Sequence, residues 1–133
     1  IRRTGRDVTI VSYAKTVHTC VEAAQKLEAM NVSAEVIDLR TLKPLDEATI
    51  LASVRKTGRL LVVHEASAMC GVGAEIAALV AQKAFNALKS PIVRITGPDV
   101  PAPASHVLEQ AFVPQAEGVI AAVKGMLSPA VTA

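Results

Sequence analysis

Residues 59–76 read R-L-L-V-V-H-E-A-S-A-M-C-G-V-G-A-E-I, and the change of pattern inside this stretch decides the fold. Residues 59–64 are apolar on both sides of an extended chain, which is typical of a strand buried in a parallel sheet. After the glycines, a helix is predicted from about Gly73 to Leu88. Its run of Ala, Leu, Val and Ile lacks a polar face, which predicts burial on most sides. The stretch is therefore a strand, a connector and a helix.

The same alternation runs along the whole chain. Further strands are predicted at residues 8–13, 34–39 and 91–96. The helices are expected to start at a Thr16 cap, to run from an Asp46 cap to Gly58, and to span about 115–127. This order predicts a three-layer α/β/α fold with a mostly parallel, flavodoxin-like sheet of four or five strands in the order 2-1-3-4. A ligand would bind outside the carboxyl ends of the first and third strands, at residues 13–15 and 64–66.

The composition bounds the function. The 133 residues predict one domain, 1–133, and the first residue, Ile1, suggests a fragment or a processed chain. A net charge of +2 and 2% aromatic residues argue against nucleic-acid binding, and no apolar run approaches the roughly 18 residues that span a bilayer. A hydrophobic content of 51% predicts an apolar face that another chain covers. Cys20 and Cys70 have no metal-ligand spacing, so two free thiols in a reducing compartment are expected.

The connector offers three interpretations. Cys70 precedes a helix start, where a thiolate is favoured, and His64 could act as its base, which would make a small α/β enzyme. The Gly71-Val72-Gly73 run could cradle a phosphate, but it lacks the third glycine of a dinucleotide fingerprint and the Lys-Ser/Thr of a Walker loop. The interpretation that the pattern favours is structural: the glycines let a helix pack closely on the sheet. A small-molecule regulatory module that binds at the sheet's switch point is a further alternative.

The remaining polar residues predict no reactive cluster. His18 is expected to pair with Glu22 on the first helix, and His106 to be solvated. Asp38 and Arg40 are interpreted as a salt bridge, with Asp46 as a helix cap. No catalytic, cofactor-binding or metal-binding residue is predicted in this chain.

Four segments together resemble the transketolase C-terminal domain, in the form found in the β-subunit of thiamine-dependent 2-oxoacid dehydrogenases. They are V-T-I-V-S-Y at 8–13, E-V-I-D-L-R-T-L-K-P-L-D at 35–46, V-H-E-A with G-V-G-A-E-I-A at 63–66 and 71–77, and R-I-T-G-P-D-V-P at 94–101. The last of these and V-P-Q-A at 113–116 favour the pyruvate dehydrogenase type; branched-chain and acetoin dehydrogenases are close rivals.

The resemblance implies a role inside a larger enzyme of the bacterial cytoplasm or the mitochondrial matrix. Two α- and two β-subunits would bind thiamine diphosphate and Mg at a site outside this domain. The domain itself would be inactive alone. It would hold the α-subunit and the second β-subunit, and would dock the peripheral subunit-binding domain of the dihydrolipoyl acyltransferase. An antiparallel edge strand is also implied, with residues 1–3 as its remnant.

The residues expected to bind that docking partner are Lys89, Ser90 and Leu127. Members of the family often have an acid at the position of Lys89, where it contacts a basic domain, and usually end near Leu127. A lysine facing a basic domain would slow association first. Docking is therefore expected to use different charges here, or a different acyltransferase partner.

Overall fold

The computed structural model describes residues 1–128 and contains a four-stranded parallel sheet in the order β2-β1-β3-β4. The strands are β1 (Val8–Ser12), β2 (Ala34–Asp38), β3 (Leu60–Ser67) and β4 (Val93–Gly97). The α/β class and the strand order are as predicted. The third strand is longer than predicted, because pairing with β4 resumes at Ser67 after a break in register beyond Val63. The predicted connector thus begins after Ser67, and His64 lies within the strand.

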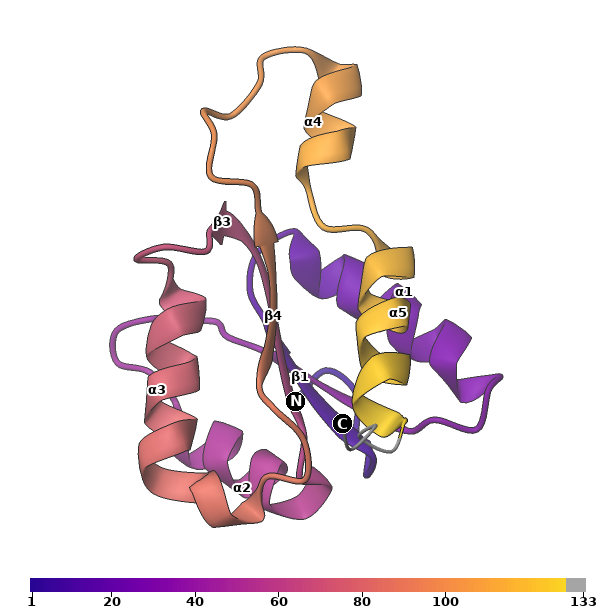
Figure 1. Cartoon of the computed structure of the whole chain (residues 1–133), viewed down its shortest axis with the longest axis vertical. Helices are drawn as coiled ribbons and strands as arrows, with labels where there is room; N and C mark the ends of the chain where they lie inside the picture. Colours follow the sequence, from indigo (N-terminus) through magenta and orange to yellow (C-terminus); the bar gives the residue numbers. More distant parts are fainter. Residues whose placement is uncertain (129–133) are drawn as a thin grey trace, which may run out of the picture.

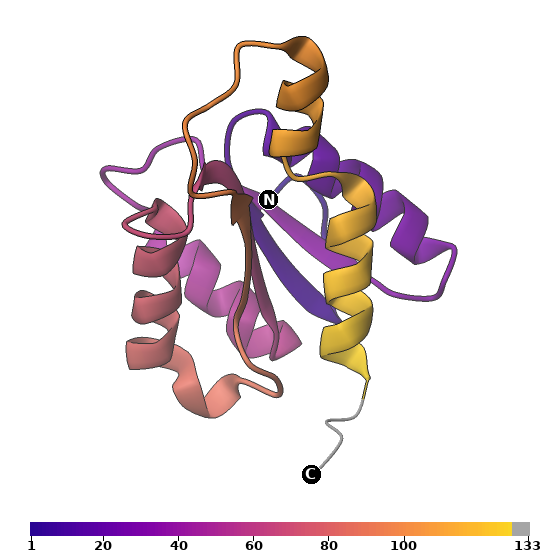
Figure 2. The same cartoon turned by 45° about the horizontal axis from the view of Figure 1, so that its top comes forward.

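Helices cover both faces of the sheet (Figures 1 and 2). One core cluster joins the sheet to α1 (Thr16–Glu28) and α5 (Ala116–Leu127), and a second joins it to α2 (Glu47–Thr57) and α3 (Val72–Ala84). Side chains alternate between these clusters along each strand: Ile10 packs with α1 and α5, whereas Val11 packs on the opposite face. Helices bury both faces of the sheet, which explains why the strands are continuous apolar runs and do not alternate with polar residues.

The predicted caps of α2 are confirmed, but that of α1 is wrong. Asp46 Oδ1 accepts a hydrogen bond from the Thr49 N–H at 3.0 Å, and Gly58 ends α2 with a φ of 77°. Thr16, by contrast, is already the first residue of α1, and its hydroxyl donates to the Tyr13 carbonyl at 2.9 Å. It also lies 2.9 Å from the Ser12 hydroxyl, so it ties the helix start to the end of β1.

The helix that was predicted from Gly73 to Leu88 is shorter and less buried. α3 ends at Ala84, and a 3₁₀ turn, η1 (Phe85–Ala87), follows. Ile76 and Val80 face the sheet, but Ala78 and Ala81 on the outer side are exposed. Within residues 1–128 the sheet and α2 bury one side of α3, and its outer side is exposed. Cover of that outer side by another chain stays a prediction.

Two further features lie at the edges of the fold. The short helix α4 (His106–Phe112), which the sequence did not predict, projects beyond the carboxyl end of the sheet at the top of Figure 1. Along the outer side of β2, the edge strand of the sheet, Arg3 forms a single antiparallel bridge with Val36. Residues 1–3 thus lie where the resemblance implied an antiparallel edge strand. No helix in the described residues is long and apolar enough to cross a membrane.

Candidate functional site

The glycine connector between β3 and α3 is built around His64. The imidazole is fully buried, and its Nε2 accepts a hydrogen bond from the Gly73 N–H at 3.2 Å. A Cβ at Gly73 would collide with this ring, and one at Gly71 would collide with the Ser67 carbonyl. The predicted structural role of both glycines, close packing of a helix on the sheet, is therefore confirmed.

His64 and Cys70 do not form a catalytic pair in this geometry. Cys70 is exposed and has a left-handed φ of 56°, whereas His64 lies beneath the connector, stacked on Tyr13 with the ring centroids 5.8 Å apart. Burial lowers the pKa of His64; the Ala66 backbone opposes this shift, and the charge of Arg94 adds to it. The Nε2 lone pair that a base would use is occupied by Gly73, so the imidazole has no means of taking a proton from an exposed thiol.

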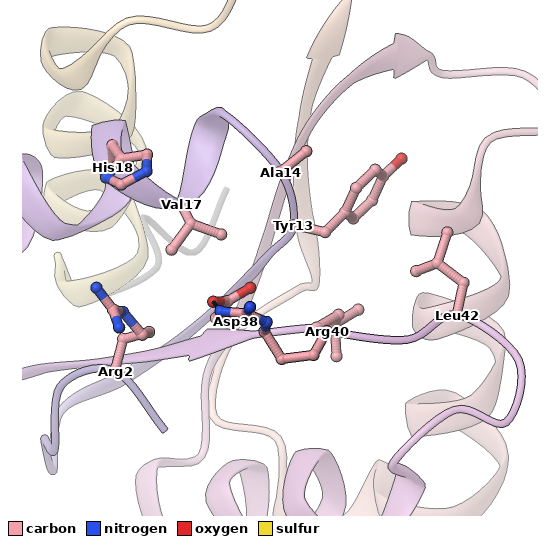
Figure 3. A pocket seen from close by; sticks show the side chains of 9 residues that line it. Arg2, Tyr13, Ala14, Val17, His18, Asp38, Arg40 and Leu42 are labelled. Carbon is pink, nitrogen blue, oxygen red and sulfur yellow. Dashed lines mark hydrogen bonds and ion pairs between the residues drawn. The ribbon is translucent and has the colours of Figure 1, made fainter.

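The carboxyl edge of the sheet has a cavity of about 460 Å³, but it does not lie between β1 and β3 as predicted. It lies over the ends of β1 and β2 (Figure 3). Asp38 and Arg40 line it and form the predicted salt bridge, with 3.2 Å between Oδ2 and Nη1. His18 also lines it. The expected pairing of His18 with Glu22 is wrong, because the Glu22 carboxylate lies 2.8 Å from Lys26 Nζ instead.

The three residues predicted for docking lie together in a groove of about 420 Å³ at the amino edge of the sheet. Lys89 and Ser90 precede β4, and Leu127 ends α5. The two segments meet because α5 runs antiparallel to the strands and so returns to the edge where β4 begins. The apolar lining of this groove comes from Pro91, Val93, Ala122, Met126 and Leu127. We call it the docking groove only because the predicted docking residues line it.

The docking groove carries positive charge and no carboxylate among its lining residues. Arg59 is held rigidly: its Nε donates to the Met126 carbonyl at 3.0 Å and its Nη1 to the Asp7 carbonyl at 3.3 Å. The Lys89 N–H donates to the Gly58 carbonyl at 2.7 Å, and its aliphatic stem lies over Gly58. The charged ends of Lys89 and Arg59 therefore flank an apolar floor. No local pattern pointed to Arg59, which lies 30 residues before Lys89 in the chain.

A second apolar depression adjoins the docking groove on the α3 side. It shares Lys89, Ser90 and Pro91 with the groove and adds Phe85, which is 68% exposed. Phe85 opens the 3₁₀ turn η1, and it lies four residues after the exposed Ala81 on the outer side of α3. Residues 89–91 thus line both apolar hollows.

Further large apolar side chains are exposed at the carboxyl end of the sheet and in the segments beyond it. Val107 and Leu108 of α4 are 74% and 58% exposed, and Met69 and Val100 in the neighbouring loops are 77% and 58% exposed. His106 of α4 is solvated, as predicted, and its Nε2 lies 3.1 Å from Gln110 Nε2. Large exposed apolar side chains of this kind mark interaction surfaces. No group of three or more His, Cys, Asp or Glu within residues 1–128 could hold a metal ion.

Comparison with known proteins gives a consistent family. The model of "Transketolase, C-terminal domain" matches residues 1–119. The chain is 46% identical over 124 residues to "Pyruvate dehydrogenase E1 component subunit beta, mitochondrial" of Dictyostelium discoideum, covering 93% of this chain and 35% of that protein. It is 48% identical over 124 residues to "Acetoin:2,6-dichlorophenolindophenol oxidoreductase subunit beta" of Cupriavidus necator, covering 93% and 37%. The chain thus spans about a third of the length of the curated relatives it matches.

Solved structures extend the likeness to the fold. The structure titled "Split gene transketolase, inactive beta4 tetramer" superposes with a TM-score of 0.80 at 31% identity, covering 94% of this chain and 39% of that one. The 2-oxoglutarate:ferredoxin oxidoreductase from Magnetococcus marinus shares the fold with a TM-score of 0.63 at 15% identity, covering 93% and 18%.

Proposed function

Because this chain belongs to the family of transketolase C-terminal domains, we propose that it is the C-terminal domain of the β-subunit of a thiamine-dependent 2-oxoacid dehydrogenase. Its role in that enzyme is to associate with other subunits and to dock the acyltransferase, without supplying catalytic groups. The observation that carries the proposal is the docking groove, which brings Lys89, Ser90 and Leu127 together on one apolar surface.

Subunit association is assigned to the carboxyl edge. Four large apolar side chains are exposed there: Met69, Val100, Val107 and Leu108. A neighbouring α- or β-subunit would cover them. The β4 tetramer named for the structurally similar transketolase supports assembly as a property of related chains.

Docking is assigned to the groove at the amino edge. Its apolar floor would accept an apolar side chain of the peripheral subunit-binding domain of the dihydrolipoyl acyltransferase. Lys89 and Arg59 at the rim would set the charge of the partner. Because the two surfaces lie at opposite ends of the sheet, subunits and acyltransferase would bind at the same time.

Thiamine diphosphate and Mg are assigned to the enzyme outside this chain. The one glycine-rich turn of the chain that resembles a phosphate cradle is filled by His64, whose Nε2 already binds the Gly73 amide. A diphosphate would need that amide free. The residues of this turn therefore do not fit the cofactor, and no step of the reaction is derived through it.

The substrate of the whole enzyme is proposed to be pyruvate. The segments R-I-T-G-P-D-V-P at 94–101 and V-P-Q-A at 113–116 favour this type. The acetoin-type relative from Cupriavidus necator is as similar as the pyruvate dehydrogenase relatives, and a branched-chain 2-oxoacid dehydrogenase is the remaining alternative. Assembly of the complete β-subunit with its α-subunit, followed by decarboxylation assays on pyruvate, branched-chain 2-oxoacids and acetoin, separates the three.

The docking proposal is tested by calorimetric titration of the chain with the peripheral subunit-binding domain of the acyltransferase from the same organism. One-to-one binding is expected for the wild type. The Leu127→Asp variant should lose it, since a carboxylate would be buried in the apolar floor. The matched control is Leu108→Asp on α4, at the other end of the molecule, which should bind as the wild type does. Equal binding of both variants, or no binding of the wild type, refutes the groove as the docking site.

A further inference from the structure

The cavity at the carboxyl edge brings together cationic groups from three separate segments. Arg2 precedes β1, His18 lies in the first turn of α1, and Arg40 follows β2. In Figure 3, Arg2 and His18 lie at one end of the cavity, Leu42 at the other, and Asp38 and Arg40 between them. Arg2 is held beside the end of β2 because its N–H donates to the Val36 carbonyl at 2.8 Å.

The hydrogen-bonding capacity of these groups is largely unused. A guanidinium has five N–H donors, and within residues 1–128 the Arg40 side chain makes one hydrogen bond, to Asp38 at 3.2 Å. The side chains of Arg2 and His18 make none within the same residues. All three side chains are exposed, so their free N–H groups are open to an incoming ligand. Donors without protein acceptors that line one cavity from several segments suit an anion.

The net charge of the cavity is positive. Asp38 is the one carboxylate among its lining residues; its side chain is 13% exposed and is already paired with Arg40. Two guanidinium groups therefore face one carboxylate, and His18 adds a ring that can donate a hydrogen bond. The N-terminal turn of α1 contributes a favourable potential for an anion at the same edge.

The rest of the lining is apolar. Tyr13, Val17 and Leu42 form walls beside the charged groups, and Leu42 is 42% exposed. A volume of about 460 Å³ admits a molecule of metabolite size. The site lies outside the carboxyl ends of β1 and β2, next to the switch point between β1 and β3 and not at it. An inorganic ion would leave the apolar walls without contact.

We propose that this cavity is a binding site for a small organic phosphate. The phosphate group accepts hydrogen bonds from Arg40, Arg2 and His18, and the organic part packs against Tyr13 and Leu42. The inference does not rest on the docking function, since the docking groove lies at the opposite edge of the sheet. If the experiment on the docking groove fails, the proposed phosphate site is unaffected, and the reverse also holds.

The test uses phenyl phosphate as probe, because it joins a phosphate to a flat apolar group, with inorganic phosphate and phenol as its separate halves. Each is titrated into the isotope-labelled chain at constant ionic strength, and backbone amide shifts are followed by NMR. Saturable shifts are expected at residues 14–18 and 38–42 for phenyl phosphate. Inorganic phosphate should bind more weakly, and phenol should not bind. The Arg40→Gln variant should weaken phenyl phosphate about tenfold, the loss expected for a charge-assisted hydrogen bond.

Two variants separate a built site from diffuse surface charge. Lys124→Gln removes the same charge from an exposed position on α5, outside the cavity, and should leave the affinity unchanged. Leu42→Ala should weaken phenyl phosphate but not inorganic phosphate. The proposal is overturned if no saturable shift appears by about 10 mM probe, a range that already includes very weak binding. It is also overturned if Lys124→Gln weakens binding as much as Arg40→Gln does.

Discussion

The Nε2 atom of His64 accepts a hydrogen bond from the Gly73 N–H at 3.2 Å, so a strand side chain caps the following helix. The first N–H groups of a helix lack partners within it and are usually satisfied by the side chain of the N-cap residue. The N-cap of α3 is Gly71, which has no side chain. His64 takes over this task from inside the core, and the two glycines leave the space for its ring. The histidine that the sequence offered as a possible base for Cys70 therefore has a structural role: it caps α3.

The first prediction concerns the space above His64. Gly73→Ala should lower the free energy of unfolding by about 1–3 kcal/mol, because the new Cβ would collide with a fully buried ring that has no room to move. Gly118→Ala is the matched control: it also replaces a helical glycine, but a Cβ there meets nothing within 4 Å. It should stabilise the chain by up to about 1 kcal/mol. Urea unfolding measures both, and a similar loss in both variants would contradict the packing argument.

The second prediction is a pH dependence set by His64. Burial lowers its pKa below the ordinary value of 6.5 in the folded chain. As pH falls through 6.5, the unfolded chain takes up a proton that the folded chain does not. Stability is therefore complete above that pH and declines below it, by at most about 1.4 kcal/mol per pH unit from this group. Urea unfolding at pH 7.5, 6.5 and 5.5 measures the slope.

The control for this slope is His64→Gln, which keeps a side-chain acceptor for Gly73 but does not titrate in this range. Its stability should be lower than that of the wild type at pH 7.5 and should vary less between pH 7.5 and 5.5. An unchanged slope in the variant would assign the pH dependence to other groups.

The third prediction concerns the buried carboxylate of Glu35 on β2. Its Oε2 binds Lys56 Nζ and accepts the Gly5 N–H at 3.1 Å, while the side chain is 1% exposed. Burial raises the pKa of Glu35, but hydrogen bonds from Lys56, Ser53 and Gly5 and the charge of Lys56 outweigh it and lower the pKa overall. Its stabilisation is thus present above the ordinary pKa of 4.5 and is lost as pH falls further.

The Glu35→Gln variant should therefore be less stable than the wild type by about 1–3 kcal/mol at pH 7, since a neutral amide makes weaker hydrogen bonds with Lys56. The difference should shrink as pH falls below 4.5. Thermal unfolding between pH 7 and pH 3 measures it. A difference that stays constant over this range would show that lost packing, not charge, is responsible.

The fourth prediction separates the two thiols. Burial raises the pKa of Cys20 to about 12, against an opposing hydrogen bond with Ser12, whereas Cys70 is exposed. Iodoacetamide should label Cys70 alone in the folded chain, at the rate of an ordinary peptide cysteine, because no base assists it. Cys20 should react only in denaturant. Mass spectrometry counts the labels, and Cys70→Ser should give none in the folded chain. A strongly accelerated Cys70 would revive the hypothesis of a small cysteine enzyme.

The order of strands and helices follows from local sequence, and the exceptions have physical causes. Extended apolar runs alternate with helical patterns along the chain, and Asp46 and Gly58 mark the ends of one helix. The rule that crossover connections are right-handed then leaves few possible arrangements of these strands and helices. β3 was predicted too short because Glu65 and Ser67 follow the apolar run that ends at His64, although pairing with β4 continues to Ser67. α4 was missed because it has only seven residues: Val107, Leu108, Ala111 and Phe112 recur at helical spacing, but over too short a segment to predict a helix.

The candidate sites were predictable only where the family resemblance pointed to them. Lys89, Ser90 and Leu127 were named from that resemblance, and the fold places them in one groove. Arg59 and Phe85 belong to the same surface but come from other segments, and the cavity of Arg2, His18 and Arg40 joins three segments. Contacts between residues far apart in the chain depend on tertiary packing, and no local pattern reports them.

The fifth prediction tests the charge of the docking groove. Lys89 flanks an apolar floor, and its stem lies over Gly58, so its ammonium group faces any partner that enters. Against a basic subunit-binding domain, Lys89→Glu should tighten binding by about threefold or more, because it replaces a repulsion with an attraction at the rim. The gain should appear mainly as faster association and should diminish as salt is raised.

Lys124→Glu, which makes the same charge reversal on α5 outside the groove, should change the affinity far less. Surface plasmon resonance at low and high salt measures both rates. If Lys89→Glu changes neither the affinity nor its salt dependence, Lys89 does not lie in the interface; if it weakens binding, the partner's contacting face is acidic.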